Sequence, residues 1–410
     1  MRVSVVGAAG HVGLPLSLVL AESGHDVYGI DIDVAASTAI MQGRMPHRED
    51  GAEELLARVL ASGRLRMTQD TGAIRDSDVV VVVIGTPIDE NLNPRVDHLF
   101  QFFERVRTHF KDQLIVLRST VSPGTTDALR QSLHADEGSK LNLVFGPERV
   151  LQGKSIHEIR SLPQIIGAYS EAAYQRAQKF FQTFNQSETF FLTPIEAELG
   201  KLITNMSRYV GFALANEFHL ICESFGANAC RIIDACNKDY PRLSLPVPGP
   251  NVGGPCLQKD GWFLIDRIPF ADLISSAFRI NEGMPMQVIQ TLASRIKGKK
   301  VAILGMTFKA NSDDTRNSLA FKLRRQLQFR GFEPVCVEPH VDNFQTIDAI
   351  KGSAAVVLMT PHDQFKDLGS IVQTVDNPEC WFVDLWGFWP EMRYRSRNGY
   401  FEANEVGQAR

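Results

Sequence analysis

Short apolar runs alternate with polar, glycine-containing loops over the first part of the chain. "VSVVG" predicts a buried strand, "LPLSLVLAESG" a helix, and "HDVYGIDID" a second strand that ends in acidic residues. These elements predict a βαβ unit of Rossmann type. The apolar runs in "DVVVVVIGTP", "QLIVLRST" and "LNLVFGPE" predict further strands. Their polar loops should gather at one edge of a parallel sheet, where open α/β sheets bind ligands.

The period of the apolar positions changes near residue 193. The stretch "TPIEAELGKLITNMSRYVGFALANEFHLICESFG" predicts one long helix, with Thr193 and Glu196 as a capping box and Gly226 just past its end. At the rise of an α-helix it would be about 48 Å long. A helix of this length is expected to join domains or to pack against a second subunit.

Strands return near residue 298. "KKVAILGMTFK", "FEPVCVEPH", "AAVVLMT" and "CWFVDLWG" alternate with helical segments such as "LAFKLRRQLQF" and predict a second, smaller α/β domain. The expected fold class is α/β, with two Rossmann-like parallel-sheet domains joined by a long central helix and a helical middle domain. The expected domain boundaries are 1–192, 193–297 and 298–410. Two similar halves around a helical middle also suggest one large, divergent duplication.

Composition and charge exclude several classes of function. The chain has 410 residues, with 43 Lys plus Arg against 47 Asp plus Glu and a net charge of -4. Because no block of like charge stands out, binding to nucleic acid or to an anionic membrane surface is not expected. No signal region precedes the first strand and no apolar run reaches the roughly 18 residues of a membrane span, so a cytoplasmic protein is expected. The 6 cysteines contain no C-x-x-C pair, which disfavours a disulfide framework and a zinc site, and no metal is expected.

The loop after the first strand, "GAAGHVG", predicts a phosphate-binding turn. It spaces Gly7, Gly10 and Gly13 as G-x-x-G-x-x-G, one residue longer than the usual dinucleotide fingerprint. Small residues still let the backbone approach a pyrophosphate at a helix amino terminus, where N–H groups and the helix dipole favour negative charge. Asp31, at the end of the second strand, is placed to accept hydrogen bonds from a ribose diol. Because its carboxylate would repel a 2′-phosphate, NAD is expected rather than NADP.

A cysteine behind two glycines, in "NVGGPCLQKD", is the most distinctive candidate for chemistry. Four other stretches carry polar residues in an order that goes with it, and they are "RSTVSPGT", "GPERVLQG", "AELGKLITN" and "TFKANSDDTRNS". Together with the phosphate loop, these stretches resemble the UDP-glucose/GDP-mannose dehydrogenase family over nearly the whole chain. The G-G-x-C-x-x-K-D and A-E-L-x-K-L-x-x-N motifs carry most of the resemblance.

The resemblance implies an NAD-dependent oxidoreductase. It would convert C6 of a UDP-hexose, glucose or N-acetylhexosamine, from alcohol to carboxylate with two NAD⁺. The family pattern implies that 1–192 binds NAD, that 193–297 contains the central helix and dimerises, and that 298–410 binds the UDP-sugar. The implied partners are the UDP-sugar substrate and a second copy of the chain in a homodimer.

Cys256 fits the chemical demand of such a reaction, because an aldehyde must be held between two hydride transfers. A thiolate adds to the aldehyde as a thiohemiacetal, whose oxidation gives a thioester that water then cleaves. Gly253 and Gly254 are expected to remove side chains so that the sugar lies against the backbone. Lys201 and Asn205, four apart on one helix, face the same way. By resemblance, they stabilise the C6 oxyanion.

The remaining roles are implied by the resemblance. Glu148 is the general base for the hydrolytic water, Asp260 helps to position this water, and Thr120 lies near the nicotinamide and the water. The implied cofactor contacts are Gly7, Gly10, His11, Val12, Gly13, Asp31, Thr86, Thr120, Lys259 and Arg316. The implied substrate contacts are Glu148, Lys201, Asn205, Arg242, Val252, Gly253, Cys256 and Lys309.

The sugar stays open at this level. Pro255 stands before the nucleophile, where UDP-glucose enzymes of the family usually have serine and many N-acetylhexosamine enzymes have histidine. "GPERVLQG" and "PRLSLPVPGPNVGG" are similar to the N-acetylhexosamine branch, whereas "CLQKD" is similar to the UDP-glucose branch. Two other functions remain compatible with the residues. One is a two-electron dehydrogenase of the hydroxyacid or 6-phosphogluconate type, which needs no Cys256, and the other is a non-catalytic sensor of NAD or nucleotide sugar.

Overall fold

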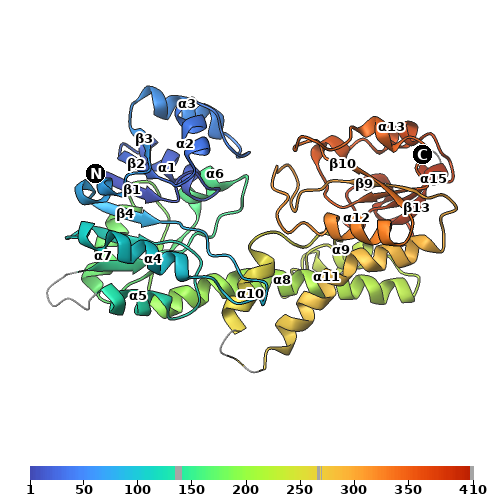
Figure 1. Cartoon of the computed structure of the whole chain (residues 1–410). Helices are drawn as coiled ribbons and strands as arrows, with labels where there is room; N and C mark the ends of the chain where they lie inside the picture. Colours follow the sequence, from blue (N-terminus) through green and yellow to red (C-terminus); the bar gives the residue numbers. More distant parts are fainter. Residues whose placement is uncertain (134–140, 266–267, 269, 407–410) are drawn as a thin grey trace. The chain divides into compact units, whose positions relative to one another are not determined.

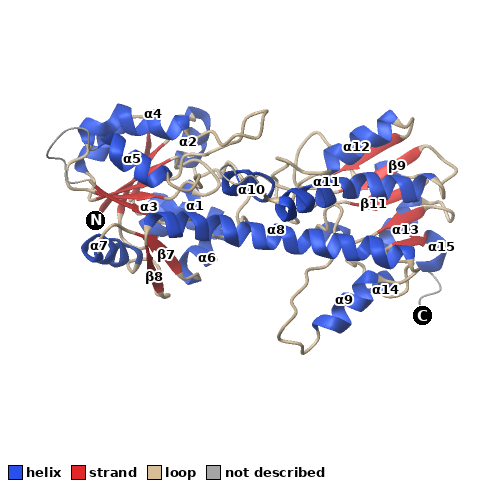
Figure 2. Ribbon diagram, turned by 90° about the horizontal axis from the view of Figure 1, so that it is seen from below, coloured by secondary structure: helices blue, strands red, loops and turns tan. Residues whose placement is uncertain are grey.

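Two compact units divide the chain between them (Figure 1). The computed structural model describes residues 1–133, 141–265, 268 and 270–406. Unit 1 comprises Met1–Thr204 and Lys259–Ile268, and unit 2 comprises Asn205–Gln258 and Pro269–Arg410. Each unit contains one sheet, drawn in red in Figure 2. The expected α/β architecture with two Rossmann-like sheets is confirmed.

The sheet of unit 1 has 8 strands in the order β3-β2-β1-β4-β5-β6-β7-β8. The strands are β1 (Arg2–Val6), β2 (Asp26–Ile30), β3 (Leu65–Thr68), β4 (Val79–Val82), β5 (Leu114–Leu117), β6 (Asn142–Phe145), β7 (Gln164–Gly167) and β8 (Thr189–Leu192). β1 to β6 are parallel, but β7 is antiparallel to β6. β8 is parallel to β7 and therefore also runs against β1 to β6. The sequence analysis did not predict this reversed edge.

Helices cover both faces of this sheet, because the alternate residues of its strands face opposite cores. Val79 and Val81 of β4 join one core, and Val80 and Val82 join the other. The first core includes α1 (Gly13–Glu22), α3 (Ala52–Ala61), α6 (Ser155–Ser161) and α7 (Glu171–Phe181). The second includes α4 (Asp97–Val106) and α5 (Thr125–Leu133). Burial on both faces explains why these strands are continuous apolar runs.

The predicted long helix is α8, which extends over the 31 residues Pro194–Ser224 and therefore belongs to both units (Figure 2). The expected capping box is present. The Thr193 backbone N–H donates to Glu196 Oε2 at 2.8 Å, and the Glu196 N–H approaches Thr193 Oγ1 at 3.4 Å. These reciprocal bonds satisfy donors that have no partner inside the helix, and they fix where α8 begins.

Unit 2 has a mixed sheet of 5 strands in the order β10-β9-β11-β12-β13. The strands are β9 (Lys300–Leu304), β10 (Glu333–Val337), β11 (Ala355–Leu358), β12 (Trp381–Val383) and β13 (Tyr400–Glu402), and β13 is antiparallel to β12. Its helices are α9 (Ala229–Asn237), α11 (Asp272–Ala293), α12 (Ala320–Phe329), α13 (Leu368–Val375), α14 (Pro390–Arg393) and α15 (Ala403–Val406). The helix α10 (Leu257–Ile265) is divided, with Leu257 and Gln258 in unit 2 and the rest in unit 1. α11 and α12 pack on one face of the sheet and α13 on the other.

Both sheets begin with the same turn. In unit 1, Gly7 follows β1 with a φ of 87° and donates its N–H to the Ile30 carbonyl oxygen at 2.8 Å. In unit 2, Gly305 follows β9 with a φ of 87° and donates its N–H to the Val337 carbonyl oxygen at 2.9 Å. Both backbones lie in the left-handed region, where glycine is strongly favoured.

An acidic residue at the end of the second strand completes the likeness. Asp31 Oδ2 accepts the Ala9 N–H at 2.8 Å, and Glu338 Oε2 accepts the Thr307 N–H at 3.1 Å. Ala9 and Thr307 each stand two residues after the glycine of their turn. Such matched contacts are what a duplication would leave, and the duplication itself stays a prediction.

We expect Gly13→Ala to destabilise the protein. A Cβ at Gly13 would lie 2.1 Å from the Gly7 carbonyl oxygen and 2.8 Å from Ala8 Cα, and both are backbone atoms. Such overpacking typically costs about 1–3 kcal/mol. The matched control is Gly283→Ala, which meets no atom within 4 Å on the exposed side of α11. Because alanine is the better helix former by roughly 0.5–1 kcal/mol, the control should be stabilised. Urea unfolding of both variants checks the opposite signs, and equal shifts would contradict the expectation.

Candidate active site

The residues predicted from the sequence are distributed over the two units. Unit 1 carries Gly7, Gly10, His11, Val12, Gly13, Asp31, Thr86, Thr120, Glu148, Lys201, Lys259 and Asp260. Unit 2 carries Asn205, Arg242, Val252, Gly253, Cys256, Lys309 and Arg316. In unit 1 they lie mainly on loops that follow the carboxyl ends of β1, β2, β4, β5 and β6. These loops share one edge of the sheet, as parallel strands require.

The phosphate loop absorbs its additional residue in a tight turn. The Gly10 N–H donates to the Gly7 carbonyl oxygen at 3.3 Å, and α1 then begins at Gly13. Asp31 holds this turn, because its Oδ2 accepts the Ala9 N–H at 2.8 Å while its Oδ1 accepts the Asp33 N–H at 2.9 Å. Each carboxylate oxygen retains acceptor capacity, so Asp31 can still receive a ribose hydroxyl.

Contacts between neighbouring loops connect several predicted residues of unit 1. The Thr86 hydroxyl, after β4, donates to the Thr120 carbonyl oxygen, after β5, at 2.5 Å. His11 Nδ1, in the phosphate loop, lies 3.2 Å from Gln152 Nε2, in the loop after β6. The structure therefore brings Thr86 together with Thr120, and it brings His11 together with the loop that contains Glu148. The sequence analysis did not identify Gln152.

Glu148 is buried and pairs with Arg118, which stands just after β5. Glu148 Oε2 accepts hydrogen bonds from Arg118 Nη2 at 2.5 Å and from Arg118 Nε at 3.1 Å. Glu148 Oε1 accepts the Arg149 backbone N–H at 2.9 Å. Because the partner is a permanent cation, the Glu148 carboxylate is held in place by charge-assisted hydrogen bonds. Sequence reasoning missed Arg118, although it stands in the quoted "RST".

Two further buried glutamates, Glu49 and Glu198, accept hydrogen bonds from the backbone N–H groups of loops at the site. Glu49 accepts the N–H groups of Gly153 at 2.8 Å and Ser155 at 2.6 Å, and so holds the loop that follows Glu148. Burial raises the pKa of Glu49, and the hydrogen bonds from this loop oppose the rise. Glu49 is 6% exposed and Ser155 1%, so the bond to Ser155 satisfies a buried N–H group.

Glu198 of α8 has the same function for the loop after β5. It accepts the N–H groups of Gly124 at 2.6 Å and Thr126 at 2.8 Å, at the beginning of α5. Burial raises the pKa of Glu198, and the hydrogen bonds from the Thr126 hydroxyl and from the two backbone N–H groups oppose the rise. Glu198 lies one helical turn before Lys201, so the same face of α8 holds the Thr120 loop and presents the lysine.

Lys201 and Asn205 are both largely buried on α8, with 9% and 6% of their surfaces exposed. Their spacing of four residues on a continuous helix places both on one face. Asp260 is fully buried and accepts a hydrogen bond from Lys259 Nζ at 2.9 Å, and this lysine also lies 4.4 Å from the centre of the Phe263 ring. The lysine expected to contact the cofactor is therefore paired with the carboxylate expected to position water.

Cys256 is exposed and directly precedes α10. A helix amino terminus favours negative charge, and the nucleophilic form of a cysteine is the negatively charged thiolate. The two glycines before it have a structural reason that differs from the expected one. A Cβ at Gly253 would lie 2.5 Å from the Asn317 carbonyl oxygen, and one at Gly254, where φ is 96°, would lie 2.5 Å from the Phe308 ring. The chain itself, and not only a sugar, requires the absence of these side chains.

Arg316 lies on the segment 307–319. This segment packs against residues 251–256, the loop that leads to Cys256, which we call the cysteine loop. The Arg316 guanidinium binds Asp314 through two bonds, from Nε to Oδ1 at 2.9 Å and from Nη2 to Oδ2 at 2.6 Å. The pKa of Arg316 is raised mainly by these hydrogen bonds, and the negative charge of the Cys256 thiolate adds to the effect. By the same attraction, Arg316 favours the thiolate of Cys256. The sequence analysis expected Arg316 to contact the cofactor and did not foresee this relation.

The other predicted residues of unit 2 have local surroundings. Arg242 is exposed, and its Nε donates to the Tyr240 hydroxyl at 2.9 Å. Lys309 is partly exposed, and its carbonyl oxygen accepts the Thr307 hydroxyl at 3.0 Å. Val252 is buried in the loop before Cys256. Their expected contacts with the nucleotide sugar stay predictions.

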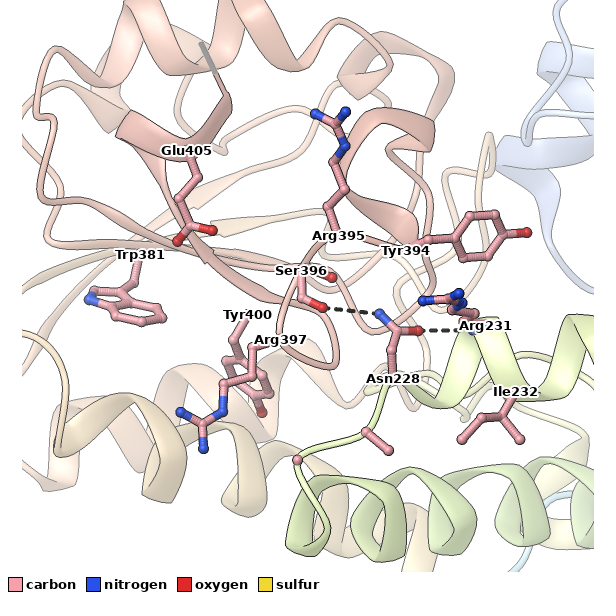
Figure 3. A pocket seen from close by; sticks show the side chains of 12 residues that line it. Asn228, Arg231, Ile232, Trp381, Tyr394, Arg395, Ser396, Arg397, Tyr400 and Glu405 are labelled. Carbon is pink, nitrogen blue, oxygen red and sulfur yellow. Dashed lines mark hydrogen bonds between the residues drawn. The ribbon is translucent and has the colours of Figure 1, made fainter. Parts of the chain in front are cut away.

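A cavity of about 580 Å³ in unit 2 does not coincide with the predicted residues (Figure 3). It is lined by Arg231, Arg395 and Arg397, together with aromatic side chains that include Tyr394 and Trp381. Figure 3 shows the guanidinium groups of the three arginines pointing in different directions. They do not converge on one position, so this cavity lacks the geometry of an anion site.

Family comparisons cover most of the chain. Residues 1–185 match the NAD binding domain of the UDP-glucose/GDP-mannose dehydrogenase family. Residues 195–283 match its central domain and residues 302–391 its UDP binding domain. The expected NAD cofactor agrees with the first match, and the expected UDP-sugar with the third. Among the described residues, the structure contains no helix with the length and apolar character of a membrane span.

Individual relatives are similar over nearly their whole lengths. A UDP-N-acetyl-D-mannosamine dehydrogenase of Methanocaldococcus jannaschii is 32% identical over 392 residues, which cover 92% of this chain and 90% of the relative. The structure of a UDP-D-ManNAc dehydrogenase from Pyrococcus horikoshii has a TM-score of 0.84 at 31% identity, covering 91% of this chain and 93% of the other. That of a UDP-glucose dehydrogenase from Pyrobaculum islandicum has a TM-score of 0.82 at 26% identity, covering 89% and 91%.

We expect Arg118→Met to lower the free energy of unfolding by about 3–5 kcal/mol, because it leaves the Glu148 carboxylate buried without its cation. The double variant Arg118→Met, Glu148→Gln should recover part of the loss, since the remaining amide carries no charge. The matched control is Arg58→Met, which removes an ion pair with Glu22 whose side chains are 60% and 30% exposed. Exposed pairs contribute less than about 1 kcal/mol. Urea unfolding of the wild type, these three variants and the Glu148→Gln single variant gives the comparison, and a simple sum of the two single effects in the double variant would argue against the coupling.

Proposed function

Because the chain belongs to the UDP-glucose/GDP-mannose dehydrogenase family, we propose that it oxidises C6 of a UDP-N-acetylhexosamine from alcohol to carboxylate in two NAD⁺-dependent steps. One observation carries the proposal beyond the family: Cys256 stands exposed at the amino terminus of α10, on a loop packed against the segment that bears Arg316. A two-electron dehydrogenase has no use for an activated thiol at this position. A four-electron dehydrogenase needs one.

The residues of unit 1 suit a bound dinucleotide. Gly10 leaves open space beside the phosphate loop, because a Cβ there would meet only the Gly7 carbonyl oxygen at 3.5 Å. The first turn of α1 presents backbone N–H groups to a pyrophosphate, and Asp31 presents acceptors to a ribose diol. When bound, NAD⁺ accepts the hydride from C6 in each oxidation step.

The proposed covalent chemistry belongs to Cys256. Its thiolate adds to the aldehyde carbon formed by the first oxidation, forming a C–S bond and a thiohemiacetal oxyanion. Lys201 and Asn205, one turn apart on α8, stabilise that oxyanion by charge and by a hydrogen bond. Loss of a second hydride from the same carbon gives a thioester. Water then cleaves the C–S bond, which releases the carboxylate and restores the thiolate.

Glu148 is the proposed base for the hydrolytic water. Both of its carboxylate oxygens are held, Oε2 by Arg118 and Oε1 by the Arg149 N–H, so its orientation is fixed before a substrate binds. Asp260 and Thr120 are the proposed partners of the same water.

The sugar is proposed from the relatives. The relatives from Methanocaldococcus jannaschii and Pyrococcus horikoshii both act on UDP-N-acetyl-D-mannosamine by their names, so this sugar nucleotide is the first choice. UDP-glucose is the second choice, because the UDP-glucose dehydrogenase from Pyrobaculum islandicum has a lower identity to this chain, 26%. The proposal keeps the cytoplasmic location expected from the sequence.

The direct test is product stoichiometry. We expect the purified protein, supplied with NAD⁺ and UDP-N-acetyl-D-mannosamine, to form two NADH for each sugar acid released. UDP-N-acetylglucosamine, UDP-glucose and GDP-mannose complete the panel, with absorbance at 340 nm and product mass as the readouts. One NADH per sugar would instead support a two-electron dehydrogenase. Saturable binding of ligands without NADH from any sugar nucleotide would support a sensor.

Two variants separate the steps of the same reaction. Glu148→Gln should release a burst approaching two NADH per active site and then stall, because loss of a general base slows hydrolysis roughly 10² to 10⁴-fold. Mass spectrometry of the acid-quenched variant should show the sugar acid nucleotide on Cys256. The adduct should be absent from the Cys256→Ala, Glu148→Gln double variant. A slow Glu148→Gln enzyme without burst or adduct would remove the thioester role from Glu148.

A homodimer is the second part of the proposal, supported by an apolar stripe on α8. Leu214, Phe218, Ile221 and Phe225 recur at spacings of three and four residues, and they are 39%, 37%, 48% and 83% exposed. Positions at these spacings lie along one side of a helix. A second copy of the chain with the same stripe would cover it in an isologous interface.

We expect light scattering to give twice the chain mass of 45.7 kDa for the wild type and the single mass for Phe218→Glu. The new carboxylate would be buried without a partner at the centre of the apolar stripe, which disfavours association. Gln373→Glu, at an exposed position of α13 on the other face of the sheet from Leu220 of α8, places the same charge elsewhere and should leave the dimer intact. A monomeric wild type at micromolar concentration would refute the proposal.

A further inference from the structure

Asn251 lies in the loop that leads to Cys256 and is almost fully buried, with 2% of its surface exposed. Its side-chain nitrogen donates to the Thr307 carbonyl oxygen at 2.9 Å. Its side-chain oxygen accepts the Leu319 backbone N–H at 2.7 Å. One carboxamide therefore binds both ends of the 307–319 segment.

The partners fix the orientation of this amide. A carbonyl oxygen only accepts and a backbone N–H only donates, so the opposite assignment of oxygen and nitrogen would lose both bonds. The Thr360 hydroxyl reinforces the junction, because it accepts from Asn251 Nδ2 at 2.9 Å and donates to the Thr307 carbonyl oxygen at 2.5 Å. Thr360 is 1% exposed, so water does not substitute for these contacts.

The two segments joined by Asn251 carry different parts of the proposed chemistry. The cysteine loop ends at Cys256, and the 307–319 segment contains Lys309 and Arg316. Their backbones also meet directly, since the Gly254 N–H donates to the Asn317 carbonyl oxygen at 3.1 Å. The attraction between a guanidinium and a thiolate depends on their distance, so it depends on how firmly these segments are joined.

We propose that Asn251 is a positioning residue for the nucleophile: its buried carboxamide locks the cysteine loop onto the 307–319 segment and thereby holds Cys256 at a fixed distance from Arg316. Asn251 does not itself touch the reacting atoms. The assignment rests on the proposed function for its catalytic consequence, but its effect on the thiol is independent of any substrate.

The 307–319 segment is also anchored by residues other than Asn251. His362 Nδ1 accepts the Asn311 N–H at 2.9 Å, and Glu338 Oε2 accepts the Thr307 N–H at 3.1 Å. Loss of the Asn251 side chain should therefore loosen the junction with the cysteine loop while the segment stays attached to the sheet. This separation makes a specific test possible.

The test is the pH dependence of Cys256 alkylation by iodoacetamide, followed by mass spectrometry of the peptide that contains Cys256. In Asn251→Ala we expect the midpoint of the alkylation profile to rise by about half a pH unit or more, because Arg316 stabilises the thiolate less well. We also expect kcat to fall roughly tenfold or more, since small displacements of reacting groups are costly, with the KM for NAD⁺ changed by less than about twofold.

The matched control is Asn185→Ala in unit 1. Asn185 is also 2% exposed, and its side-chain nitrogen donates to the carbonyl oxygens of Ile159 at 2.7 Å and Leu162 at 2.9 Å. This variant should lose comparable stability without moving the alkylation profile. Thr360→Val, which keeps the shape but removes the hydroxyl, should shift the profile in the same direction by a smaller amount. It keeps the test open if Asn251→Ala does not fold.

The alkylation midpoint of a double variant shows whether Asn251 and Thr360 act through one hydrogen-bond network or independently. The double variant Asn251→Ala, Thr360→Val should shift the midpoint by less than the sum of the single shifts. An unchanged profile in both single variants, or an equal shift in Asn185→Ala, would overturn the proposal. If the wild type oxidises no nucleotide sugar, the proposed function fails while the alkylation profile still decides the role of Asn251.

Discussion

Buried carboxylates that accept backbone N–H groups hold the loops on which this protein depends. A loop that approaches a ligand cannot pair its N–H groups in a sheet or a helix, yet buried N–H groups must be satisfied. Glu49, Glu148, Glu198 and Glu338 meet this need, each with no more than 7% of its surface exposed. Several directed donors offset part of the cost of burying each carboxylate.

These carboxylates also explain how separate elements reach a common edge with fixed geometry. Glu198 belongs to α8, but its acceptors define the beginning of α5, 72 residues earlier in the chain. Glu49 precedes α3 and fixes the loop after β6, more than 100 residues later. Long-range bonds of this kind place strand-end loops relative to one another more firmly than their own short sequences do. The same principle operates through an uncharged group at Asn251.

The sequence predicts the periodic parts of the structure well, because periodicity is a local property. The capping box and apolar spacing predicted a helix from residue 193, and α8 extends over Pro194–Ser224. The strands of the Rossmann-like sheets were found for the same reason. The reversed β7 and β8 were missed, since β8 carries the exposed Phe190 and Phe191 and lacks the buried apolar run that marked β4 and β5. At the site, the motifs led to Cys256 and Glu148 as candidates, but Arg118, Glu198 and Asn251 were not identifiable because their side chains bond partners 28 to 109 positions away.

The two halves share the turns at Gly7 and Gly305, but the acids beside these turns differ in their surroundings. Asp31 keeps part of its surface open to solvent, whereas the side chain of Glu338 is fully enclosed and also lies 3.0 Å from His362 Nε2. The His362 ring therefore stands beside the enclosed acid of unit 2, whereas the partly exposed Asp31 is bonded to backbone N–H groups. A ribose diol finds an accessible acceptor in unit 1 and none at the equivalent acid of unit 2. The two acids thus differ in access from solvent while the backbone turns beside them are alike, so the difference comes from occlusion by side chains.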